Sequence, residues 1–127
     1  MMDTGPASPK LVVERLRDAM NRHDLDGFLA LIDPDYRSDQ PLHPQRAFVG
    51  KDQVRKNWTK IFEEHADFHA ELVSVVAEAD TVWSEWHWSG TRTDGTELNS
   101  RGVIIFGIGA GQVMSGRLYM EQVQQTA

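Results

Sequence analysis

The sequence contains no cysteine. A chain without cysteine has no disulfide, no thiol nucleophile and no thiolate metal ligand, so these kinds of site are excluded. Basic residues are also scarce relative to acidic ones, because 13 Lys and Arg against 19 Asp and Glu give a formal net charge of -6. This balance repels phosphate backbones, and we therefore expect no nucleic-acid partner.

Long apolar runs are absent as well. The most apolar stretch, Val103 to Gly111, has about half of the ~20 residues that a membrane-spanning helix needs, so we expect no membrane partner. The first residues lack the basic and apolar regions of a secretory signal. We accordingly expect a cytoplasmic protein.

The overall composition is that of an ordinary globular domain. The chain has 127 residues, of which 40% are hydrophobic and 25% are charged. These values predict a single domain over residues 1–127 with one hydrophobic core, and we expect its first residues, about 1–7, to form a flexible N-terminus.

The N-terminal half has the patterns of three helices. Ser8-Pro9 combines a capping side chain with a favourable first helical residue, and apolar residues then recur on one face to about Asn21. Asp24 caps a second helix that Asp33-Pro34 ends. After a short extended piece at 36–40 and a loop at 41–50, a third amphipathic helix continues to about Asp67.

The C-terminal half, rich in valine, tryptophan and isoleucine, has the patterns of strands. Segments 68–77 and 82–92 are extended, Asp94-Gly95 is a hairpin signal, and the glycines between 107 and 111 separate the last two strands. Three helices followed by four long strands predict an α+β domain with an antiparallel sheet, because parallel strands need crossover connections.

Three short segments carry a family resemblance. With this order of elements, Asp24-Leu25-Asp26-Gly27-Phe28, Gly50-Lys51-Asp52-Gln53-Val54-Arg55 and Gly116-Arg117-Leu118-Tyr119-Met120-Glu121 resemble the SnoaL-like branch of the NTF2-like superfamily. The resemblance implies a cone in which a curved antiparallel sheet wraps around the helices, usually as a homodimer. Family members include polyketide cyclases, steroid isomerases, epoxide hydrolases and proteins without known activity, so function must be argued from the site.

The resemblance also implies a hydrophobic pocket for a small apolar or aromatic molecule. Along strand 82–92, Trp86 and Trp88 share one face with Val82 and Ser84, and Trp83 lies on the other. The pocket would be lined by Leu16, Met20, Trp58, Phe62, Trp86, Trp88, Leu118 and Met120. The alternative is that these side chains simply fill a solid core.

A polar cluster lies where the family places its general base. Asp39 is the candidate base with His43 as a neighbouring catalytic group, while a register shift of one residue would put Gln40 into the pocket and turn Asp39 away. This cluster favours a cofactor-independent polyketide cyclase or isomerase type of reaction. The alternative is a non-catalytic ligand-binding or accessory protein that uses the same pocket.

Several features of the family's enzymes are missing. By the same resemblance, the two groups that hold the oxyanion in steroid isomerases correspond to Leu16 and Gly102, and neither side chain can donate a hydrogen bond. The arginine–aspartate arrangement of the epoxide hydrolases is absent around Arg101 and Arg117. His65 and His69 have helical spacing but no completing carboxylates, so we expect no metal and no cofactor.

The opposite face of the strands carries a different set of side chains. Arginine and tyrosine are enriched at protein interfaces, and this face is expected to join two copies of the chain. Its residues are His87, Arg101, Arg117, Tyr119 and Glu121.

Overall fold

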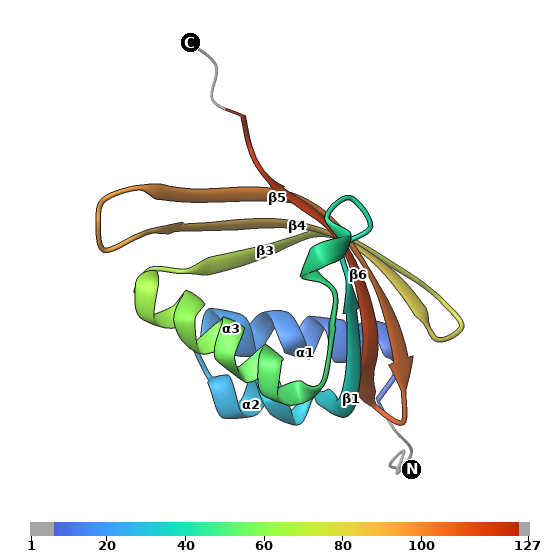
Figure 1. Cartoon of the computed structure of the whole chain (residues 1–127). Helices are drawn as coiled ribbons and strands as arrows, with labels where there is room; N and C mark the ends of the chain where they lie inside the picture. Colours follow the sequence, from blue (N-terminus) through green and yellow to red (C-terminus); the bar gives the residue numbers. More distant parts are fainter. Residues whose placement is uncertain (1–6, 125–127) are drawn as a thin grey trace.

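The computed structural model describes residues 7–124 (Figure 1). Apart from Ala7, the segment expected to be a flexible N-terminus lies outside these residues. The elements are, in chain order, α1 (Pro9–Asn21), α2 (Leu25–Ala30), β1 (Ile32–Asp39), the 3-10 turn η1 (Pro44–Arg46), β2 (Phe48–Val49), α3 (Lys51–Glu64), β3 (His69–Glu78), β4 (Thr81–Thr91), β5 (Glu97–Gly109) and β6 (Gln112–Gln122).

The strands form one mixed sheet in the order β2-β1-β6-β5-β4-β3. The antiparallel prediction is confirmed for β3 to β6, which follow one another through hairpins. It is wrong for β1, which lies parallel to β6 with Asp39 opposite Arg117. The long connection through α3 and β3 to β5 supplies the crossover that a parallel pair needs.

The strand β1 is longer than predicted. Ile32 begins this strand, whereas the spacing of apolar residues places it on the second helix, which ends at Ala30. Pro34 is tolerated because the pairing with β6 is interrupted between Ile32 and Arg37, so its missing N–H breaks no regular ladder bond there. The third helix also ends earlier than predicted, at Glu64.

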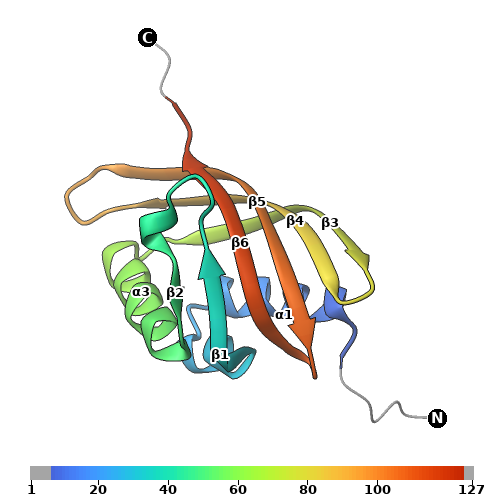
Figure 2. The same cartoon turned by 45° about the vertical axis from the view of Figure 1, so that its right-hand side comes forward.

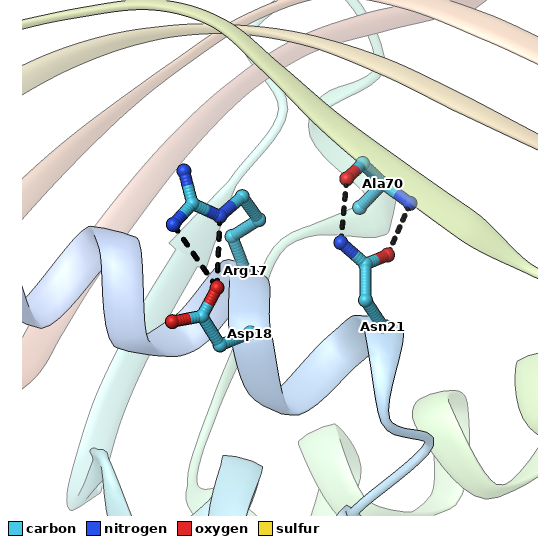
Figure 3. Close-up of polar contacts among 4 residues, drawn as sticks. All are labelled: Arg17, Asp18, Asn21 and Ala70. Carbon is cyan, nitrogen blue, oxygen red and sulfur yellow. Dashed lines mark hydrogen bonds and ion pairs between the residues drawn. The ribbon is translucent and has the colours of Figure 1, made fainter.

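The helix α1 lies under the sheet (Figure 1), is capped at its start and is fixed to the sheet at its end. At its start, the Ser8 hydroxyl accepts a hydrogen bond from the Leu11 N–H at 3.3 Å. At its end, the Asn21 amide donates to the Ala70 carbonyl at 2.9 Å and accepts from the Ala70 N–H at 2.7 Å (Figure 3). Arg17 and Asp18 pair at 3.0 Å on the same helix, a surface contact that contributes little to stability.

The sheet arches over the helices, and α3 lies across its open side (Figures 1 and 2). The predicted alternation along β4 is confirmed, because Val82, Ser84 and Trp86 are buried on the concave face. Trp83 points to the convex face and is 52% exposed. The curvature leaves space between the concave face and α3, where the candidate site lies.

Within residues 7–124, no helix has the length and apolar character needed to cross a membrane.

Candidate functional site

A cavity of about 630 Å³ lies between the three helices and the concave face of the sheet. We call it the main cavity. Its volume is in the range of small-molecule sites, roughly 300–1,000 Å³. Most of its wall is apolar: Leu16, Met20, Phe28, Ile32, Phe48, Val54, Trp58, Ile61, Trp88, Ile104, Phe106, Val113 and Leu118.

Trp58 is the centre of the aromatic part of this wall. Its ring centroid lies 4.9 Å from that of Phe28 and 5.5 Å from that of Trp88, and the two indoles meet at 77°. Edge-to-face contacts of this kind hold aromatic rings in a defined arrangement. The two tryptophans therefore present fixed, flat surfaces to the main cavity.

A row of polar side chains from the β1 edge also lines the main cavity. Tyr36, Ser38 and Gln40 alternate along the chain and project to the same side, while Arg37 and Asp39 are exposed. Burial raises the pKa of Tyr36 above its ordinary value of about 10, with the nearby Asp39 charge adding to the increase and Ser38 opposing it. The Tyr36 hydroxyl therefore stays protonated at neutral pH and can donate a hydrogen bond.

Gly116 on β6 makes room for this tyrosine. A Cβ atom added at Gly116 would lie 2.6 Å from the Tyr36 hydroxyl oxygen, closer than any non-bonded carbon and oxygen can approach. A side chain at this position would push Tyr36 out of its place. The glycine in the family-like segment 116–121 thus shapes the cavity wall.

The charged residues of the main cavity are both cations. Arg46 on η1 donates a hydrogen bond to the Gln40 side-chain oxygen at 3.2 Å, and Lys60 lies on the exposed surface of α3 with Glu64 at 3.9 Å. Among the residues described as lining this cavity there is no aspartate, glutamate or histidine. In a chain of net charge -6, the cavity therefore favours a neutral or anionic ligand.

A second hollow of about 400 Å³ adjoins the main cavity beyond the C-terminal end of α3. We call it the side cavity. The two share Gln40, Lys60, Ile61, Trp88 and Leu118. The side cavity is more polar, because its remaining wall consists of Glu64, His65, Phe68, Arg92, Leu98, Ser100 and Met120.

Most of the residues predicted to bind a ligand lie at these two cavities. The main cavity is lined by Leu16, Met20, Gln40, Trp58, Trp88 and Leu118. Met120 lines the side cavity. The structure thus brings these seven residues together, and their role in binding a ligand remains a prediction.

Asp39 does not line either cavity, contrary to the expectation for a general base. It is exposed and lies in a shallow groove on the convex face with Arg37 and Arg117. The cause is the register of β1, where the inward positions are Tyr36 and Ser38 and the next is Gln40. The alternative register, with Gln40 inside and Asp39 turned away, is the one that the structure has.

Three other predicted residues also lie away from the cavity walls. His43 contacts the Glu121 carboxylate at 2.5 Å in an exposed pair that joins the loop after β1 to β6. Phe62 stacks on His23 with centroids 4.9 Å apart. Trp86 is 1% exposed, and its indole N–H donates to Ser84, so it belongs to the core.

Sequence reasoning missed several lining residues. Tyr36 and Ser38 share the parity of Gln40, so the choice of register would have identified them. Arg46, Asn57 and Lys60 had no such signal, because charged and amide side chains on a loop and a helix surface are usually solvated.

Within the described part of the chain, no group of three or more histidine, aspartate and glutamate side chains is arranged to hold a metal ion.

Comparison with known proteins gives a family match. The model of the SnoaL-like domain matches residues 13–115. None of the curated proteins matches the sequence.

Solved structures with low sequence identity share the fold. A protein of Jannaschia sp. CCS1, provisionally described as a SnoaL-like polyketide cyclase, is 20% identical with a TM-score of 0.76 over 95% of this chain and 90% of its own. AclR of Streptomyces galilaeus, provisionally described as a hydroxylase, is 20% identical with a TM-score of 0.77 over 90% of this chain and 79% of AclR. Bal32a, from a soil-derived mobile gene cassette, is 22% identical with a TM-score of 0.75 over 88% of each chain.

Proposed function

The chain belongs to the SnoaL-like domain family, and from this premise we propose that its main cavity binds a small, planar and largely apolar molecule. The observation that carries the proposal is a hollow of about 630 Å³ with the rings of Trp58 and Trp88 in its wall. Flat apolar surfaces favour planar ligands because stacking and burial of ring faces both stabilise the complex.

The polar residues of the cavity suggest how such a molecule is oriented. Tyr36 can donate a hydrogen bond from deep in the wall, and Arg46 and Lys60 attract electron-rich groups to the rim. A planar ring that carries oxygen atoms on one edge can accept the hydrogen bond from Tyr36 and can also be attracted by the two cations. A few placed polar groups in an apolar site typically fix orientation rather than supply most of the affinity.

A cyclase or isomerase reaction in the same cavity is the second candidate. It is favoured by the converging row of Tyr36, Ser38 and Gln40, since hydrogen-bond donors aimed at a developing oxyanion lower a reaction barrier. The described lining includes no carboxylate to act as base. We therefore place binding first. In a cofactor-independent reaction this row would hold the developing oxyanion by hydrogen bonds, and the base would come from outside the described lining.

Calorimetric titration with 2-methoxynaphthalene tests the binding proposal. We expect one saturable site per chain and a negative heat-capacity change, the signature of apolar surface leaving water. A panel of larger aromatic polyketides and steroids extends the test to other shapes. If no planar compound binds at all, the proposal is wrong.

We also propose that the convex face joins two copies of the chain. Apolar side chains on this face are unusually exposed, with Val76 at 62%, Trp83 at 52% and Tyr119 at 36%. Beside them runs a row of polar side chains across paired strands, Glu71, His87, Arg101 and Glu121. Such a face is complementary to a second copy turned by a two-fold rotation, because the Arg101 of each copy can meet a carboxylate of the other.

Light scattering after size exclusion checks the dimer. At tens of micromolar we expect a mass of twice 14.4 kDa, and Trp83→Glu should give the mass of one chain because it buries a charge at the interface centre. Leu42→Glu, on an exposed loop away from the sheet, is the matched control and should remain dimeric. A wild-type monomer at this concentration contradicts the interface.

A further inference from the structure

Two buried side-chain nitrogen atoms in the described part of the chain have no hydrogen-bond partner. They are the Nε2 atom of His65 and the Nε1 atom of Trp88. Buried polar atoms are nearly always paired, because an unpaired one has lost its hydrogen bonds to water without replacement. Both residues line the side cavity, so the two exceptions occur at the same hollow.

The local structure brings the two rings to the same strand. His65 caps the end of α3 and packs over Gly90, where a Cβ atom would lie 3.2 Å from the His65 Cβ and 3.5 Å from its Cδ2. Gly90 is two residues beyond Trp88 on the same face of β4, so the Cα atoms of these two residues lie about 7 Å apart. The Thr91 N–H donates to Asp67 at 2.7 Å, which fastens the turn after His65 to this strand and lowers the pKa of Asp67.

The chemistry of the two atoms is complementary. The His65 Nδ1 atom lies 2.9 Å from the Ile61 carbonyl oxygen, so a neutral ring places its proton there and leaves Nε2 as an acceptor. The indole nitrogen of Trp88 is a donor only. A hydroxyl group can donate to the first and accept from the second, whereas an ether or carbonyl oxygen cannot donate and an ammonium group cannot accept.

We propose that His65 and Trp88 form a binding site for a phenolic or enolic hydroxyl of the ligand. This inference rests on the proposed function, because the rest of the ring occupies the main cavity, which is continuous with the site through Trp88 and Leu118. Each of the two atoms exposes less than 1 Å² to solvent, so the hydroxyl reaches them only when neighbouring side chains of the side cavity move, and it is then held away from water. In such surroundings a ligand that lacks the hydroxyl leaves both atoms unpaired and therefore binds much less tightly.

Calorimetric titrations with 2-naphthol and 2-methoxynaphthalene test the site, because the two probes share a ring system and only the first can donate a hydrogen bond. We expect wild-type protein to bind 2-naphthol at least about tenfold more tightly. His65→Phe should abolish this preference while changing the affinity for 2-methoxynaphthalene by no more than about threefold. His69→Phe, at an exposed position on β3, is the matched control and should retain the preference.

The indole N–H resonances of unaltered protein provide a second readout. Binding of 2-naphthol should move the Trp88 resonance downfield, as expected for a new hydrogen bond, and leave that of Trp83 on the convex face in place. Equal affinities for the two probes, a preference that survives His65→Phe, or an unmoved Trp88 resonance would overturn the hydroxyl site alone. If neither probe binds, the proposed function fails together with it.

Discussion

Replacing Gly102 with alanine is expected to lower the free energy of unfolding by at least about 3 kcal/mol. Gly102 lies at the centre of the sheet, opposite Trp86 on β4 and Met120 on β6, with a φ of +157°. A Cβ atom added there would lie 2.8 Å from the Tyr119 carbonyl carbon and 2.9 Å from the Met120 Cα, and would overlap the Tyr119 carbonyl oxygen. These are backbone atoms of a paired strand, so they cannot move aside cheaply.

Urea unfolding with linear extrapolation measures this effect. Gly95→Ala is the matched control, because Gly95 also has a positive φ, +88°, but has open space around its missing Cβ. We expect the control to lose only about 1–2 kcal/mol from backbone strain. Equal decreases in the free energy of unfolding for the two variants would show that the contact of the added Cβ atom with β6 does not destabilise the fold.

The same contact bears on which reactions the cavity can support. By family resemblance, Gly102 occupies the position of the protonated aspartate that holds the oxyanion in steroid isomerases. Here β5 and β6 approach too closely for any side chain at that position. The missing acid is therefore excluded by the strand geometry, and restoring it by Gly102→Asp is expected to cost folding stability rather than create an isomerase.

Filling the main cavity should remove ligand binding while leaving the fold intact. Leu118 projects from β6 into the junction of the two cavities and is half-buried. In Leu118→Trp the larger ring extends into empty space, so we expect a stability change within about 1.5 kcal/mol. The affinity for 2-methoxynaphthalene should fall by at least about tenfold, since the added indole occupies the ligand's place.

The neighbouring residue supplies the control for this variant. Tyr119 is next to Leu118 on the same strand but projects from the convex face. Tyr119→Trp adds an indole at almost the same place in the chain, and it should leave the affinity within about twofold of wild type. Undiminished binding by Leu118→Trp would place the ligand outside the main cavity.

Sequence patterns were sufficient for the features that depend on local chemistry. Ser8-Pro9 and Asp24 begin the first two helices as predicted, and Asp94-Gly95 lies in the turn between β4 and β5. Alternation also identified the buried and exposed faces of β4, with Trp86 inside and Trp83 outside. Each of these signals involves residues close together in the sequence.

Features that depend on distant partners were not predictable in this way. The parallel pairing of β1 with β6 joins residues about 80 positions apart, and a one-residue change in its register decides whether Asp39 or Gln40 lines the cavity. Alternation assigns a face but no depth: Trp86 and Trp88 share the concave face, yet only Trp88 reaches the main cavity. The hydrogen bond from Trp86 to Ser84 keeps the other ring in the core.

A crystal structure of the protein grown with 2-methoxynaphthalene tests the central claim most directly. We expect electron density for the planar rings inside the main cavity, within about 4 Å of the Trp58 and Trp88 side chains. Density for the rings only on the convex face beside Trp83, or a main cavity that stays free of the compound at saturating concentration, would contradict it.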